Sequence, residues 1–183
     1  MSTDFDSLGK MYSDAIESFL KMEAETILDD VSERNLCGRL AIQLEREIQA
    51  RGLEGYVADT EYNRKQRGHV KTILSDNMEI INITCDLIVH SRGRVIQNDN
   101  LIAIEMAKPN KTTADILADK NRLRALTKSS YDGVWSYGDG AHPEHVCGYV
   151  MGIFIMVDRV NRVLKAEVFR SGERVGRFDD LRF

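Results

Sequence analysis

The sequence predicts an α/β domain whose elements run helix, helix, three meandering strands, helix and two strands. Apolar residues recur at helical spacing over most of the first 50 residues. The spacing then falls to two, which is typical of strands with one buried face. After Pro109 the helical spacing returns, and two strand-like segments follow it.

Two amphipathic helices are expected at the start of the chain. The first covers residues 7–28 and belongs to an N-terminal segment, 1–31, that either packs on the domain or pairs with another chain. The second begins after the candidate N-cap Ser32 and ends at Gly52. The remaining domain spans 32–183, and 43% hydrophobic residues suffice for one buried core.

Three strands are expected next, over 56–62, 83–90 and 100–108. A polar and basic loop or flap, 63–82, separates the first two. Arg-Gly-Arg and Asn-Asp-Asn turn signals separate the last two, so the three strands form a meander.

A further helix is expected over 112–126, with Thr112 as its N-cap. A loop rich in Gly, Asp and His follows over 129–145. Strands over 149–157 and 163–169 then complete the predicted fold.

Two carboxylates interrupt the apolar strands of the meander. Asp86 lies within the second strand and Glu105 within the third. A buried charge costs several kcal/mol when it has no partner. Two such charges on neighbouring strands therefore predict a shared cation, and carboxylate oxygens favour Mg²⁺ or Mn²⁺.

Composition limits the choice of partners and compartment. With a net charge of -4 and a sequence pI near 5.6, the chain is no polycation, so contact with nucleic acid needs a local basic patch. Its three cysteines are widely spaced, which predicts reduced thiols in a cytoplasmic protein. The longest apolar run, 148–157, is too short for the roughly 20 residues of a membrane helix, and the polar start predicts no signal peptide.

The order of elements, with Asp on the second strand and Glu on the third, resembles the PD-(D/E)XK nuclease superfamily. The resemblance spans roughly residues 32–170 and implies a restriction-endonuclease-like core of helix, three-strand meander, helix and strand, with an extra N-terminal helix. It rests on these motifs in order: Ser32-Glu33-Arg34, Arg39-Leu40-Ala41, Asp59-Thr60-Glu61-Tyr62-Asn63-Arg64, Cys85-Asp86-Leu87-Ile88-Val89-His90, Asn100-Leu101, Ile104-Glu105, Asp119 and Arg122-Leu123.

The resemblance implies a Mg²⁺- or Mn²⁺-dependent endonuclease that hydrolyses DNA, with RNA left open, in prokaryotic defence against foreign DNA. Asp86 and Glu105 would hold the metal, with Glu33 or Glu61 as a further ligand. His90 is either a site residue or a structural hydrogen-bond partner. The chain would act as a homodimer or as a partner subunit of a defence system. The candidate nucleic-acid contacts are Arg64, Lys71, Lys120 and Arg122.

Two positions depart from the superfamily pattern. Cys85 replaces the Pro expected before Asp86, which costs little, and the second departure matters more. Where Glu-x-Lys is expected, Ala107 occupies the Lys position and Lys108 follows one residue late, on the opposite strand face. An introduced Lys-to-Ala change explains this, and we favour it. Alternatively, a bulge turns Lys108 inward, or Lys71 or Lys120 replaces the missing ammonium. In the third explanation the chain is an inactive nuclease fold that binds nucleic acid or a partner.

Overall fold

The computed structural model describes residues 2–62, 72–74, 80–82, 84–128 and 147–183, and of 72–74, 80–82 and 178–180 the backbone alone. Its helices are α1 (Phe5–Leu28), α2 (Glu33–Ala50) and α3 (Thr113–Thr127). The main sheet has the order β1-β4-β5-β6-β7-β8. Its strands are β1 (Val57–Thr60), β4 (Leu87–His90), β5 (Asn100–Ala107), β6 (Met151–Asp158), β7 (Val163–Arg170) and β8 (Glu173–Arg182). The structure thus confirms the mixed α/β class.

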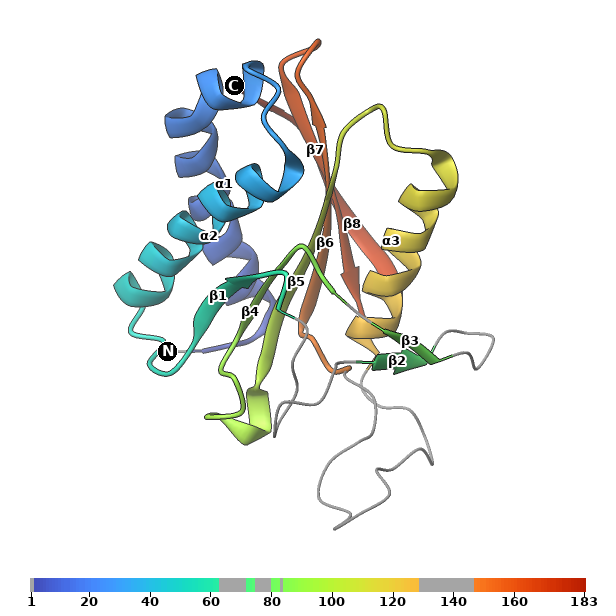
Figure 1. Cartoon of the computed structure of the whole chain (residues 1–183). Helices are drawn as coiled ribbons and strands as arrows, with labels where there is room; N and C mark the ends of the chain where they lie inside the picture. Colours follow the sequence, from blue (N-terminus) through green and yellow to red (C-terminus); the bar gives the residue numbers. More distant parts are fainter. Residues whose placement is uncertain (1, 63–71, 75–79, 83, 129–146) are drawn as a thin grey trace.

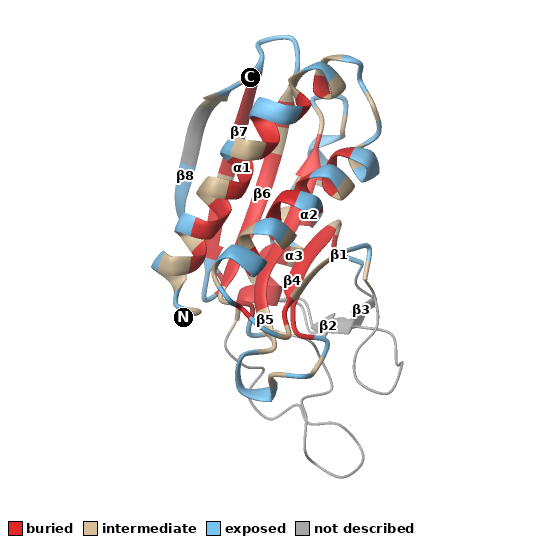
Figure 2. Cartoon of the chain, turned by 90° about the vertical axis from the view of Figure 1, so that its left-hand side faces the viewer, coloured by how far each residue is buried: buried red, intermediate tan, exposed pale blue. Residues whose placement is uncertain are grey.

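The sheet lies between two helical layers. Helices α1 and α2 cover one face, and α3 covers the other (Figures 1 and 2). Strands β1, β4 and β5 form an antiparallel meander, while β5 and β6 are parallel and joined by the α3 crossover. Helix α1 shares one hydrophobic core with α2 and the sheet, in which Phe19, Leu40 and Ile104 are fully buried.

Both faces of β5 are buried, and its side chains alternate between the layers. Ile104 and Met106 belong to the core under α1 and α2. Ala103 and Ala107 belong to the smaller core under α3. Glu105 therefore faces α3 together with Ala107, as the period of a strand requires.

Two of the predicted helix starts agree with the structure, while α1 begins at Phe5, two residues before its predicted start. The Ser32 side chain accepts a hydrogen bond from the Asn35 N–H at 3.2 Å, and Thr112 accepts one from the Asp115 N–H at 3.1 Å. Each bond satisfies an N–H group that has no partner inside its helix. Both predicted N-caps are confirmed.

Three parts of the structure differ from the prediction. β4 begins at Leu87, so Asp86 precedes the strand rather than lying within it. Part of the predicted flap forms a separate hairpin of β2 (Thr72–Leu74) and β3 (Ile80–Asn82), which pair antiparallel. β8 was not predicted, because its sequence is rich in charge and lacks an apolar period. Backbone pairing with β7 holds this strand in the sheet, and its residue Val175 remains 52% exposed. The predicted loop over 129–145 lies outside the described residues.

Gly152 on β6 permits the close approach of α3, which makes it sensitive to substitution. A Cβ at this position would lie 3.0 Å from Thr127 Cγ2 and 3.3 Å from Phe169 Cβ. We expect Gly152→Ala to lower the free energy of unfolding by about 2 kcal/mol in urea titrations, because the core is overpacked. Gly38→Ala is the control, since its Cβ would meet no described atom within 4 Å and Ala favours a helix by about 1 kcal/mol. Equal stability of the two variants would contradict this packing.

Candidate active site

Asp86 and Glu105 lie at the same end of two neighbouring strands. β4 begins immediately after Asp86, and Glu105 lies near the end of β5, where the chain leaves the sheet toward α3 (Figure 1). The antiparallel ladder pairs Leu87 with Ile104, so Asp86 and Glu105 occupy the next pair of opposite positions. Asp86 Oδ2 also accepts a hydrogen bond from the backbone N–H of Met106 at 2.8 Å. The main chain of β5 thus fixes the Asp86 carboxylate beside Glu105.

The Glu105 carboxyl group is buried, with a relative exposure of 1%. Burial raises its pKa well above the ordinary value, the positive charge of Arg122 opposes this shift, and the negative charges of Asp86 and Asp119 add to it. Asp86 and Glu105 are therefore close enough to repel each other. A cation placed between them would relieve that repulsion.

A chain of ion pairs extends from Glu105 through the middle of α3 to the turn that precedes this helix. Arg122 Nε donates to Glu105 Oε1 at 2.8 Å, and Arg122 Nη2 donates to Asp119 Oδ1 at 2.8 Å. Lys111 Nζ lies 2.6 Å from Asp119 Oδ2. Asp119 is 4% exposed, so this chain of alternating charges lies largely inside the protein. We call Glu105, Arg122, Asp119 and Lys111 the acid–base cluster.

Ala107 and Lys108 face opposite sides of the sheet. Ala107 is fully buried against the α3 layer, in the core that contains Leu123. The Lys108 ammonium instead binds Asp30 Oδ1 at 2.9 Å and the carbonyl of Val31, in the turn between α1 and α2. Lys108 is thus held away from the acid–base cluster, and the face of Glu105 carries no charge at position 107.

Glu33 and Glu61 reach the same region by different routes. Glu33, the first residue of α2, accepts the backbone N–H of Lys108 at 3.0 Å, which attaches it to the end of β5. Glu61 is 39% exposed and pairs with Arg34 at 2.6 Å. Both approach the buried thiol of Cys37 in α2, as do Asp86 and Glu105. Burial first, and then the charges of these four carboxylates, raise the pKa of Cys37. Of the two further candidates, Glu33 is bonded to the strand that carries Glu105.

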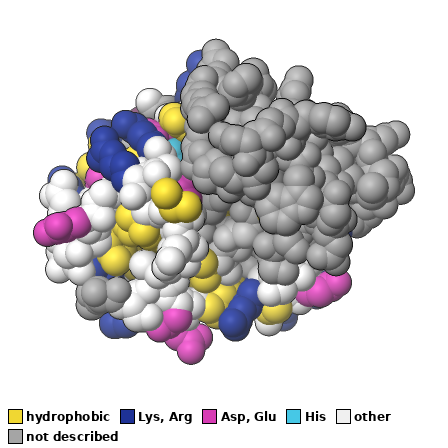
Figure 3. Space-filling view, turned by 90° about the horizontal axis from the view of Figure 1, so that it is seen from below, with side chains coloured by type: hydrophobic (Ala, Val, Ile, Leu, Met, Phe, Trp, Pro, Cys, Tyr) yellow, Lys and Arg dark blue, Asp and Glu magenta, His cyan; other side chains and the backbone are white. Residues whose placement is uncertain are grey.

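The candidate nucleic-acid contacts do not gather into one described surface. Arg64 and Lys71 lie outside the described residues. Lys120 pairs with Glu167 at 2.6 Å and lies over the Phe154 ring. Arg122 belongs to the acid–base cluster. Figure 3 shows side chains of both charge signs, among apolar ones, on the described part of one end of the molecule.

His90 takes part in a different set of interactions. It is 1% exposed, and its Nε2 lies 2.9 Å from Asp59 Oδ2. Asp59 also accepts a hydrogen bond from Arg92 Nε at 2.7 Å. This arrangement favours the structural alternative for His90.

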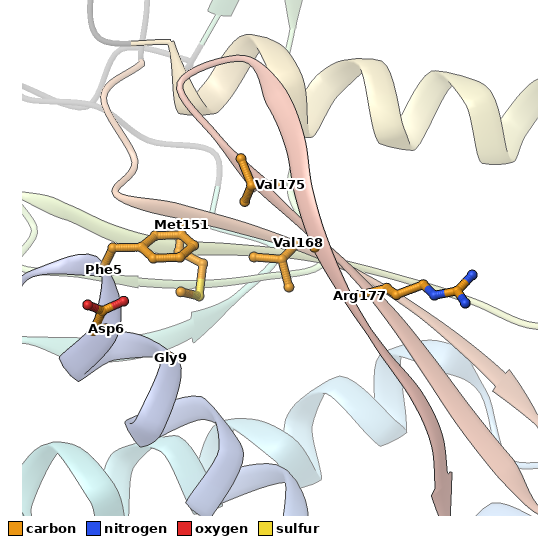
Figure 4. Close-up of a pocket in the computed structure, with 8 residues that line it drawn as sticks. Phe5, Asp6, Gly9, Met151, Val168, Val175 and Arg177 are labelled. Carbon is orange, nitrogen blue, oxygen red and sulfur yellow. The ribbon is translucent and has the colours of Figure 1, made fainter.

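A pocket of about 300 Å³ lies elsewhere, between the start of α1 and strands β6 to β8. Phe5, Met151 and Val168 line its apolar part, while Arg177 extends away from them (Figure 4). No paired carboxylates line this pocket. The candidate chemistry is therefore placed at the acid–base cluster and at Asp86.

Within the described ranges, no three His, Cys, Asp or Glu side chains lie close enough together to hold a metal ion as they stand. In those ranges, too, no helix combines the length and apolar character needed to cross a membrane.

The fold and the cluster define a mixed α/β protein with a buried acid–base cluster at the crossover end of its sheet. Comparison with protein-family models, with curated proteins and with solved structures found no match to this chain.

Sequence reasoning missed Lys111 and Cys37 as neighbours of the candidate site. Lys111 lies in the turn between β5 and α3, and its backbone N–H donates to the Lys108 carbonyl at 3.0 Å. The Pro-Asn pair before it was a signal for such a turn. Cys37 carried no signal, because a single Cys inside an amphipathic helix reads as core.

Proposed function

We propose that the chain is a metal-dependent nuclease of the PD-(D/E)XK superfamily that hydrolyses DNA phosphodiester bonds. The order α2, β1, β4, β5, α3 and β6 supports this proposal, with the β2–β3 hairpin inserted between β1 and β4. The observation that carries the proposal is the proximity of Asp86 and Glu105, whose mutual repulsion helps to raise the pKa of the buried Glu105.

The donor set near Asp86 fits Mg²⁺ or Mn²⁺ better than a softer metal. Asp86, Glu105 and Glu33 offer hard carboxylate oxygens, and Glu61 is the second choice because it pairs with Arg34. Burial raises the pKa of both Cys37 and Cys85, so these thiols stay protonated and offer no thiolate for zinc. When bound, the cation would lower the pKa of the attacking water and neutralise charge on the phosphate.

Backbone N–H groups orient the candidate ligands, and Arg122 balances the charge of Glu105. The Met106 N–H orients Asp86, and the Lys108 N–H orients Glu33. Arg122 compensates the buried charge of Glu105 while no substrate or cation is present. For a cation to bind, Glu105 must turn from Arg122 or share its carboxylate.

A role in prokaryotic defence against foreign DNA, as a homodimer or with a partner subunit, follows from the resemblance alone. Cutting both strands of a duplex favours two sites related by symmetry. RNA is the alternative substrate.

The same core also supports a second candidate function, a binding subunit without catalysis. Two observations favour it: Ala107 leaves the face of Glu105 uncharged, and Arg122 already neutralises Glu105. Such a protein would bind nucleic acid or another protein and would leave phosphodiester bonds intact.

Cleavage assays separate the two candidates. The protein with Ala107, called the wild type from here on, and Ala107→Lys are incubated with supercoiled plasmid and, separately, with labelled RNA, in Mn²⁺, in Mg²⁺ and in EDTA. The nuclease proposal predicts DNA nicking or linearisation that depends on the cation. If neither protein cleaves either nucleic acid in any cation while the wild type still retards DNA in gels, the binding function is the correct one.

A further inference from the structure

Hydrolysis of a phosphodiester places additional negative charge on the phosphate oxygens in the transition state. A positively charged side chain beside those oxygens is an effective way to stabilise it. On β5, the position that shares the face of Glu105 carries the buried methyl group of Ala107. The charge therefore has to come from another element.

Among the described residues, Lys108, Lys120 and Arg122 each bind other groups, and the remaining candidate Lys71 lies outside those residues. The Lys108 ammonium lies on the other face, bound to Asp30 and Val31. Lys120 pairs with Glu167. Arg122 uses two of its nitrogens to hold the carboxylates of Glu105 and Asp119. Releasing Arg122 toward a substrate would leave Glu105 buried and without this partner.

Lys111 is placed differently. The turn that follows β5 returns Lys111 over the strand end, through the bond from its N–H to the Lys108 carbonyl. Among the described residues, its ammonium pairs with one carboxylate, that of Asp119 at 2.6 Å. Its side chain is 23% exposed, compared with 6% for Asp119. Asp119 thus holds the ammonium in place, while part of the Lys111 side chain stays exposed to an incoming ligand.

The electrostatics connect Lys111 to the proposed ligands. Burial by itself would lower the pKa of Lys111, but the hydrogen bond to Asp119 and the charges of Asp119, Glu33 and Asp86 raise it overall. The side chain therefore stays positively charged next to two of the residues that would hold a cation.

We propose that Lys111, anchored by Asp119, supplies the positive charge that contacts the scissile phosphate in place of a lysine at position 107. Asp119 is the positioning residue in this arrangement. The inference rests on the proposed nuclease function and adds the identity of the residue that stabilises the transition state.

Three single variants test Lys111 against a lysine on another element. Lys111→Met keeps the length of the side chain without its charge, Lys111→Arg keeps the charge, and Lys10→Met is the control, because Lys10 lies on α1 and pairs with Asp14 at 3.3 Å. We measure single-turnover cleavage of plasmid in Mn²⁺, Mn²⁺ affinity by calorimetry and thermal unfolding. Lys111→Met should lower the cleavage rate on the order of a hundredfold, with Mn²⁺ affinity nearly unchanged. Lys111→Arg should stay within about tenfold of the wild type, and Lys10→Met should cleave at the wild-type rate.

Failure of the role of Lys111 and failure of the nuclease function would give different results. If the wild type cleaves and Lys111→Met cleaves as fast as Lys10→Met, Lys111 is not the residue, and the nuclease function stands. If Ala107→Lys cleaves but the wild type does not, Lys111 cannot replace a lysine at 107, and again only this inference fails. If neither the wild type nor Ala107→Lys cleaves in any cation, the nuclease function and the role of Lys111 are both wrong.

Discussion

Asp86→Asn should lower the rate of cation-dependent DNA cleavage roughly a thousandfold, because a bound cation supplies several kcal/mol of transition-state stabilisation. The amide of Asn still offers an oxygen to the Met106 N–H, which Asp86 accepts at 2.8 Å. The substitution therefore removes the charge while retaining the bond that orients the side chain. Single-turnover cleavage in Mn²⁺ and calorimetric titration with Mn²⁺ measure the two effects together.

Asp158→Asn provides the matched control for this change. Asp158 ends β6 and accepts hydrogen bonds from Asn161, and its charge is not among those that shift the pKa of Glu105. Its amide variant should cleave at the wild-type rate. Full activity in Asp86→Asn, or an equal loss in both variants, would show that Asp86 holds no catalytic cation.

Arg122→Met should lower the free energy of unfolding by about 3 kcal/mol at pH 8 in EDTA, because it leaves the buried Glu105 carboxylate without its partner. The loss should depend on pH. Since burial raises the folded-state pKa of Glu105 and Arg122 opposes that rise, removing Arg122 raises it further. The folded state then binds a proton more tightly than the unfolded state, so stability falls as pH rises above the unfolded pKa of Glu.

The measurement for Arg122→Met is therefore a series of urea titrations between pH 5 and pH 8. Relative to the wild type, the variant should lose less stability at pH 5, where Glu105 is more readily protonated. The double variant Glu105→Gln/Arg122→Met should lose this pH dependence. Arg124→Met, on the same helix, is the control: its partner Glu173 is 80% exposed, so the loss should not exceed about 1 kcal/mol. If Arg122→Met and Arg124→Met lowered the free energy of unfolding equally, the ion pair between Arg122 and Glu105 would not be desolvated.

Most of the fold could be predicted because its elements carry strong local signals. Helices α1 and α2 show an apolar face and a polar cap, as at Ser32, and the strands of the meander and β6 are dense in apolar residues. β8 could not be predicted, because an edge strand needs no apolar period and takes its order from β7. The start of β4 was placed too early, because Asp86 looks like part of the strand when only its apolar neighbours are considered.

The candidate site was predicted less completely. The alternation of a strand correctly separated Ala107 from Lys108, and it linked Ala107 with Glu105. It could not reveal the contacts that join distant segments, such as Arg122 with Glu105 or Glu33 with the Lys108 N–H. Arg122 looked like a residue of a solvated helix face, and a sequence gives no measure of how deeply such a side chain is buried.

Lys108 joins two segments that are distant in sequence. Its ammonium binds the turn at Asp30 and Val31, while its backbone N–H binds Glu33 at the start of α2. These contacts therefore hold the turn and the end of β5 together. The length of that turn sets the spacing between Glu33 and the carboxylates of the sheet. In the proposed nuclease, a residue inserted or deleted there would change the distance between the candidate ligand Glu33 and the carboxylates of Asp86 and Glu105.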